Sequence, residues 1–113
     1  RWAAALKIYQ AALAPVAHTE HGRKELTVAV VAGAIFRSAA HIYRWYLLRK
    51  KKRTSKLAPA EKALLCTEID NLQTALPYVQ GDPRLGFHEE AQWQMYDVPG
   101  MIRKIAVLKK YLE

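Results

Sequence analysis

Apolar residues recur every three or four positions along most of this chain, a spacing that places them on one face of an α-helix. The first stripe predicts a helix over residues 1–14, and its members are Trp2, Leu6, Tyr9 and Leu13. Pro15 ends this helix, because its ring disfavours helical backbone at the preceding residue. Residues 18–22 are polar and predict a short connection.

The longest stripe predicts a second helix over residues 23–50, roughly 40 Å long at about 1.5 Å per residue. We expect a broad buried face on it, formed by Leu26, Val30, Phe36, Ile42, Trp45 and Leu48. Its most apolar part is the run of eleven residues from Leu26 to Phe36. That run is shorter than the roughly 20 residues that cross a bilayer. We therefore predict a buried core helix and no membrane span.

Two further helices follow. The third is predicted to begin at Pro59, a residue suited to the first helical turn, and to end near Pro77. Its buried stripe is Leu65, Ile69, Leu72 and Leu76. The fourth begins after Asp97, a good N-cap, and reaches the end of the chain with Ile102, Ile105, Leu108 and Leu112. With no strand pattern evident, we predict an all-α, four-helix bundle-like fold with one long ordered loop before the last helix.

Size and composition limit the organisation of the chain. Its 113 residues suit a single domain over residues 1–113, and an apolar content of 51% suffices for a core. The sequence opens at Arg1 as if within a helix, so we expect a fragment, the C-terminal part of a larger protein. Cys66 is the only cysteine, which excludes an internal disulfide; its spacing predicts a small buried side chain. The compartment stays open, with the cytoplasm slightly favoured.

The positive charge is local. The net charge is +8, yet without the run at residues 49–53 and Lys56 the chain has twelve basic and ten acidic residues. The run consists of Arg49, Lys50, Lys51, Lys52 and Arg53. One interpretation is a solvated linker between helices; the other is a site for an anionic partner, either nucleic acid or an acidic surface. No aromatic residue interleaves with the run, which argues against nucleic acid.

Histidine suggests two further sites. His18 and His21 are three residues apart, but they lack the third ligand and the i,i+4 spacing of a catalytic zinc site. We therefore predict no metal and no cofactor. Arg37, His41 and Arg44 share one face of the second helix and need anionic or hydrogen-bonding partners. We expect these partners from the loop, at Asp82, Glu89 or Glu90, either to pin the loop or to face a ligand.

The loop over residues 80–97 holds the most distinctive sequence. Asp82-Pro-Arg-Leu-Gly-Phe-His-Glu-Glu-Ala91 is followed by Met95-Tyr-Asp97 and by Ile102-Arg-Lys-Ile105 in the last helix. This pattern resembles the C-terminal segment of large bacterial glycoside-hydrolase-like proteins, which typically reads D-S-R-L-G-[FYW]-H-x-E-A before an aromatic residue and a final helix. Here Pro83 replaces the usual Ser. A weaker similarity covers Arg44-Trp-Tyr-Leu-Leu48.

The resemblance implies a helical accessory domain that supports or lines the rim of a carbohydrate site, with an upstream domain of the same chain as its partner. The candidate ligand-binding residues are Asp82, Arg84, His88, Glu90, Arg37, His41 and Arg44. Glycoside hydrolysis needs two carboxylates that face the same bond, and the adjacent Glu89 and Glu90 do not suit that geometry. We therefore assign no catalytic residue within the chain, and whether the parent protein is a glycosidase stays open.

The alternative function is that of an independent helical module that binds an anionic partner through residues 49–53. A third interpretation is a purely structural domain. The sequence does not indicate an oligomeric state.

Overall fold

The structure is a computed structural model that describes residues 1–50, 52, 54–82, 85 and 97–113. Within these residues it is all-α, with four α-helices and no strand, as predicted. The helices are α1 (Trp2–Leu13), α2 (Glu20–Arg49), α3 (Pro59–Gly81) and α4 (Val98–Leu112), and a 3-10 turn, η1 (Ala14–Val16), follows α1. Most of the predicted loop before the last helix lies outside the described residues.

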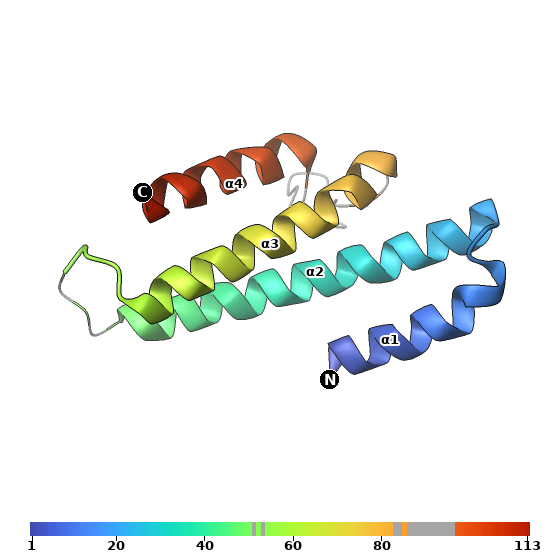
Figure 1. Ribbon diagram of the computed structural model, residues 1–113, viewed down its shortest axis with the longest axis horizontal. Coiled ribbons are helices and arrows are strands. Elements are labelled where there is room, and N and C mark those ends of the chain that lie inside the picture. The colour runs from blue at the N-terminus through green and yellow to red at the C-terminus, as the bar shows by residue number, and fades with distance from the viewer. Residues whose placement is uncertain (51, 53, 83–84, 86–96) are drawn as a thin grey trace, which may run out of the picture.

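The four helices lie side by side in chain order, each antiparallel to the one before it (Figure 1). The α2–α3 pair forms the centre; α1 packs on α2, and α4 packs on α3. At 30 residues, α2 is the longest helix and sets the 51 Å long dimension of the molecule. The predicted spine is thus confirmed.

The core lies between α2, α3 and α4. Its buried apolar side chains are Val31, Ala34, Ile69, Leu72, Ala75, Val79, Met101 and Ile105. Because α3 contributes half of them, it is the helix with the most covered surface. The predicted α3 stripe is confirmed at its first three positions, which are buried, and its fourth, Leu76, packs against the core.

The contact between α2 and α3 resembles a short coiled-coil seam. Buried positions on α3 alternate in steps of four and three, at Glu61, Leu65, Glu68, Leu72, Ala75 and Val79. On α2 the buried positions follow the same rhythm, at Val31, Ala34, Ser38 and His41. This spacing keeps one face of each helix against its partner. Polar residues therefore occupy positions in the seam itself.

Helix α2 begins three residues earlier than predicted, because Thr19 caps it. The Thr19 hydroxyl accepts a hydrogen bond from the Gly22 amide at 3.0 Å and donates one to the Val16 carbonyl at 2.6 Å. This satisfies one amide of the first helical turn. The polar connection predicted over residues 18–22 is consequently shorter, and Gly22 lies buried inside α2.

Three predicted core residues of α2 are exposed. Phe36, Ile42 and Leu48 have exposed fractions of 56%, 61% and 41%, so their predicted burial is wrong. The reason is that α3 packs on the face that carries Ser38 and His41, which turns these apolar side chains away from the core. Val30, by contrast, is buried as predicted.

Three further expectations are corrected. Pro77 lies inside α3 and does not end it. Pro77 has no N–H to donate to the Gln73 carbonyl, but both residues are exposed to solvent. Helix α3 continues past Pro77 because Val79 is buried in the core. Cys66 is exposed, because it lies off the seam. On α4, Ile102 is half exposed, and the burial predicted there falls on its neighbour Met101.

By length and composition, α2 is able to cross a membrane: its most apolar 18-residue window has a mean hydropathy of 1.5. A third of that window is buried inside the molecule, and the core helix of a soluble protein meets the same criterion. The predicted absence of a membrane span therefore stays a prediction.

The turn between α1 and α2 yields a stability prediction. A Cβ atom on Gly22 would collide with the Val16 backbone carbonyl. Gly22→Ala should therefore lower the free energy of unfolding by about 1–3 kcal/mol, although alanine is the better helix former. Gly81→Ala is the matched control, because among the described residues the added Cβ meets no atom within 4 Å beyond its chain neighbours and its own helix backbone. Urea unfolding curves that show the two variants equally stable would contradict this account of the turn.

Candidate functional site

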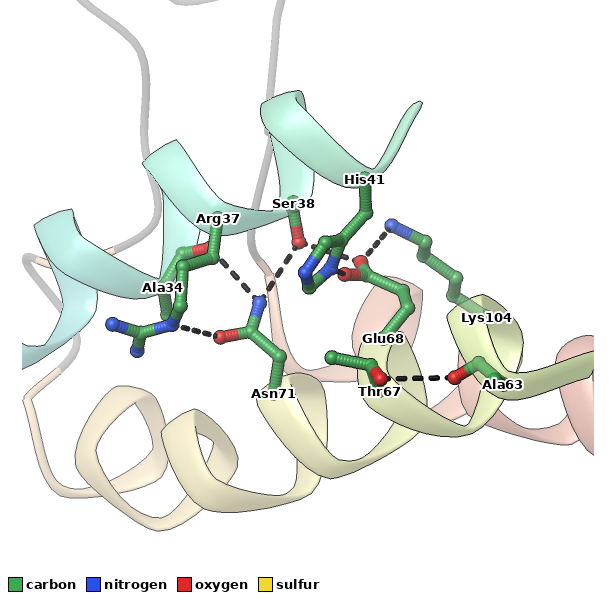
Figure 2. Close-up of polar contacts among 9 residues, drawn as sticks. All are labelled: Ala34, Arg37, Ser38, His41, Ala63, Thr67, Glu68, Asn71 and Lys104. Atoms are coloured by element: carbon green, nitrogen blue, oxygen red, sulfur yellow. Dashed lines mark hydrogen bonds and ion pairs between the residues drawn. The ribbon is translucent and has the colours of Figure 1, made fainter. Parts of the chain in front are cut away.

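A cluster of polar side chains lies at the centre of the α2–α3 seam (Figure 2). We call it the Glu68 cluster, and its members are Arg37, Ser38, His41, Glu68, Asn71 and Lys104. Glu68 is only 5% exposed. Burying a carboxylate is costly unless hydrogen bonds and opposite charge compensate, so its partners determine whether the cluster is stable.

Three side chains from two other helices bond the Glu68 carboxylate. Ser38 of α2 donates to Oε1 at 2.5 Å, and Lys104 of α4 reaches the same oxygen at 2.6 Å. His41 Nδ1 lies 2.6 Å from Oε2. Because an ionised carboxylate only accepts hydrogen bonds, His41 donates from Nδ1. A single side chain of α3 therefore joins α2 and α4.

Asn71 extends the cluster one turn along α3. Its side-chain Nδ2 donates to the Ala34 carbonyl at 3.0 Å and to the Ser38 hydroxyl at 3.2 Å, while its Oδ1 accepts from Arg37 Nε at 2.7 Å. The bonds run in one direction, from Arg37 through Asn71 and Ser38 to Glu68. In the described part of the chain, no buried side-chain nitrogen or oxygen lacks a partner.

These contacts keep Glu68 ionised. Burial raises the pKa of its carboxyl, but hydrogen bonds from Lys104, Ser38 and His41 together outweigh burial and hold the pKa below its ordinary value. An imidazole held by a carboxylate also occurs in catalytic sites. Here, however, the carboxylate is bonded by three donors at once. The arrangement thus favours a structural role over proton transfer.

A cavity of about 260 Å³ adjoins the cluster. His41 and Trp45 of α2, Leu64 of α3, and Leu108 and Tyr111 of α4 are among the residues that line it. Its walls are mostly apolar. His41, Glu68 and Lys104 of the cluster also border it, but little of its lining is polar, so it offers few polar groups to a ligand.

Glu61 makes a second clamp at the other end of the seam. It is 1% exposed, and its carboxylate accepts from the Ala58 amide at 2.6 Å, from Arg49 at 3.3 Å and from Lys52. Hydrogen bonds from Lys52, from the Ala58 amide and from Arg49 lower the pKa of Glu61 to about 2, against the opposing effect of burial. Glu61 thus joins the start of α3 to the end of α2.

This clamp changes the interpretation of the basic run. Two of its five residues, Arg49 and Lys52, form ion pairs with Glu61, and Arg49 also lies 5.6 Å above the Trp45 ring. Lys50 is exposed. Lys51 and Arg53 lie outside the described residues. At least part of the run therefore has a structural role that neither sequence interpretation included.

A third feature is the cavity where α2 begins and α3 ends, with a volume of about 550 Å³. We call it the end cavity. The residues that line it include Glu20, Arg23, Lys24, Thr27, Tyr78 and Asp82. Glu20 and Lys24 form an ion pair at 2.8 Å. Asp82 follows α3 directly and is 7% exposed. Charged groups and a tyrosine thus line a space that Asp82, the first residue after α3, also borders.

The structure separates the residues that the sequence grouped as a ligand site. Arg37 and His41 lie in the Glu68 cluster, whereas Asp82 lines the end cavity and Arg44 is exposed near Leu47. The partners found for Arg37 and His41 are Asn71 and Glu68 of α3. The expected pairing of this face with the loop stays a prediction. Arg84, His88, Glu89 and Glu90 lie outside the described residues.

Sequence reasoning missed Glu68, Asn71 and Glu61. The available signal was the spacing of Glu61 and Glu68, since both lie in step with the buried leucines of α3, where a polar residue needs a buried partner. Asn71 is buried beside that stripe, next to Leu72, and the spacing did not mark it. Among the described residues, no group of three or more His, Cys, Asp or Glu side chains is placed to hold a metal ion. Comparison of the chain with family models, curated proteins and solved structures finds no match.

The Glu61 clamp predicts an acid-labile contribution to stability. The folded pKa of about 2 is below the ordinary 4.5, so this contribution is fully present above about pH 5 and is lost as the pH falls from 4.5 towards 2. Glu61→Gln should be less stable at pH 7 and lose less stability across that interval. Thermal melts between pH 7 and pH 2.5 measure the stability at neutral pH and the stability lost on acidification. Asp70→Asn, an exposed change on the same helix, is the control; a Glu61→Gln profile parallel to that of the unmodified protein would refute the clamp.

Proposed function

We propose that this chain is a helical accessory domain of a glycoside-hydrolase-like protein, and that its end cavity lines the rim of a carbohydrate site. The proposal rests on one spatial relation. The segment that resembles such proteins begins at Asp82, in the wall of the end cavity, and leads to Asp97, the N-cap of α4.

The described residues of that segment are attached to the helices. Asp82 is buried, its carbonyl accepts from the Leu85 amide at 3.1 Å, and Leu85 packs against the core. At the other end, the Asp97 carbonyl accepts from the Met101 amide at 2.9 Å. Binding residues are often carried on loops positioned by a rigid scaffold, and this attachment supports such a role.

The chemistry of the end cavity suits a sugar. Tyr78 is partly exposed, at 36%, and offers a ring face for the C–H groups of a pyranose. Arg23 supplies donors for hydroxyl groups. Glu20 supplies acceptors, as does the Thr27 hydroxyl, which donates its own proton to the Arg23 carbonyl. The cavity of 550 Å³ is within the roughly 300–1,000 Å³ of ordinary small-molecule sites.

An accessory role fits the acidic residues better than a catalytic one. Glu61 and Glu68 are the two buried glutamates described, and each is engaged by cationic partners that lower its pKa. A general acid for glycoside hydrolysis needs the opposite shift, a raised pKa. We therefore assign the chemistry to another part of the parent protein.

Binding of soluble oligosaccharides by the intact protein tests the proposal. A panel of cello-, chito- and malto-tetraose, measured by titration calorimetry, should contain at least one ligand. Tyr78→Ala and Arg23→Ala should each weaken its affinity roughly tenfold, which corresponds to about 1.4 kcal/mol.

Tyr111→Ala is the control, because this tyrosine is also exposed but lies on α4 away from the end cavity. It should leave sugar affinity unchanged. The proposal fails if no oligosaccharide of the panel binds, or if the end-cavity variants bind as tightly as the control.

A further inference from the structure

The second half of α2 exposes a continuous apolar face. We call it the α2 stripe, and its members are Phe36, Ala40, Tyr43, Tyr46 and Leu47. The four large side chains have exposed fractions of 47% to 64%. Steps of four, three and four residues from Phe36 to Leu47 place them along one side of the helix.

The stripe is uncovered because α1 reaches only part of α2. Trp2, the first residue of α1, lies against Gly33 and meets the Phe36 ring edge-on, with centroids 5.0 Å apart. Figure 1 shows α1 beside the first half of α2 only. The other side of α2 is occupied by α3, so Tyr43, Tyr46 and Leu47 remain exposed. A contiguous apolar face of this kind commonly marks an interaction surface.

The positive charge around the stripe indicates which kind of surface it would bind. Arg44 and Lys50 are exposed within or beside it, and the whole chain carries a net charge of +8. Two copies of such a surface repel each other, which disfavours self-association. An anionic surface is attracted, and lysines or arginines near anionic lipid headgroups add to binding.

We propose that the α2 stripe docks in the plane of an anionic lipid surface. Tyrosines favour the boundary between headgroups and acyl chains, because the ring is apolar and the hydroxyl polar. Phe36 and Leu47 supply apolar contact with the acyl chains, and Arg44 and Lys50 supply the flanking cations. This arrangement is that of an interfacial amphipathic helix. The stripe and the end cavity share no residue.

Flotation of the intact protein with large unilamellar vesicles tests the docking. Vesicles of phosphatidylcholine with a quarter phosphatidylglycerol should bind the protein, and pure phosphatidylcholine should bind it at least tenfold more weakly. Salt at about 0.5 M should weaken binding, since it screens exposed charges. The double variant Tyr43→Ser, Leu47→Ser should lose at least tenfold in affinity, and Lys50→Glu roughly fivefold.

Ile8→Ser is the matched control, because Ile8 is 71% exposed on α1, outside the stripe. It should bind vesicles like the unmodified protein. Thermal melts check that the double variant keeps its fold. Tyr43→Gln alone, which removes the aromatic ring without changing the charge, provides a second loss-of-binding variant. Absence of binding to anionic vesicles, equal binding to neutral ones, or full binding by folded stripe variants would each overturn the proposal.

Discussion

The rest of the structure depends on the burial of one carboxylate. Glu68 lies inside the α2–α3 seam, and it stays ionised only because Ser38 and His41 of α2 and Lys104 of α4 bond it together. Shifting α3 along α2 by one turn would leave these donors and the carboxylate without partners, at a large free-energy cost. Apolar seams tolerate such shifts better, because leucines replace one another with little penalty. The cluster therefore fixes the register of the central helix pair, and through Lys104 it also fixes the position of α4.

A second acid one heptad earlier repeats this arrangement. Glu61 forms ion pairs with Arg49 at the end of α2 and with Lys52 in the connection to α3. Both acids on the seam face of α3 therefore hold α2 in place. This double attachment leaves the remaining surfaces of α2 available for binding. The end cavity forms where α2 begins, and the α2 stripe lies on its second half, away from α3. The proposed sugar contact and the proposed lipid contact thus use separate parts of one rigid helix.

Periodicity predicted the four helices and their order, because hydrophobic spacing depends on each helix alone. It could not identify which face of α2 meets α3, since that helix is apolar on several sides. Phe36 and Ile42 were therefore placed in the core, whereas the buried face carries Ser38 and His41. The sequence indicates that His41 needs an anionic or hydrogen-bonding partner, and the structure supplies Glu68 of α3. The identity of that partner depends on the register between the two helices, which the local sequence does not reveal. Pro77 shows the same limit, since tertiary anchoring beyond it outweighs its tendency to end a helix.

A double-mutant cycle between His41 and Glu68 tests the central claim most directly. His41→Ala, Glu68→Ala and the double variant would be unfolded in urea at pH 7, and the free energies of unfolding compared. If the buried pair fixes the seam, the two substitutions should be coupled by roughly 1.5–3 kcal/mol, because either one already removes the shared bond. The exposed pair Glu20 and Lys24 provides a reference that should couple only weakly. Additivity of the His41 and Glu68 substitutions within about 0.5 kcal/mol would contradict the claim.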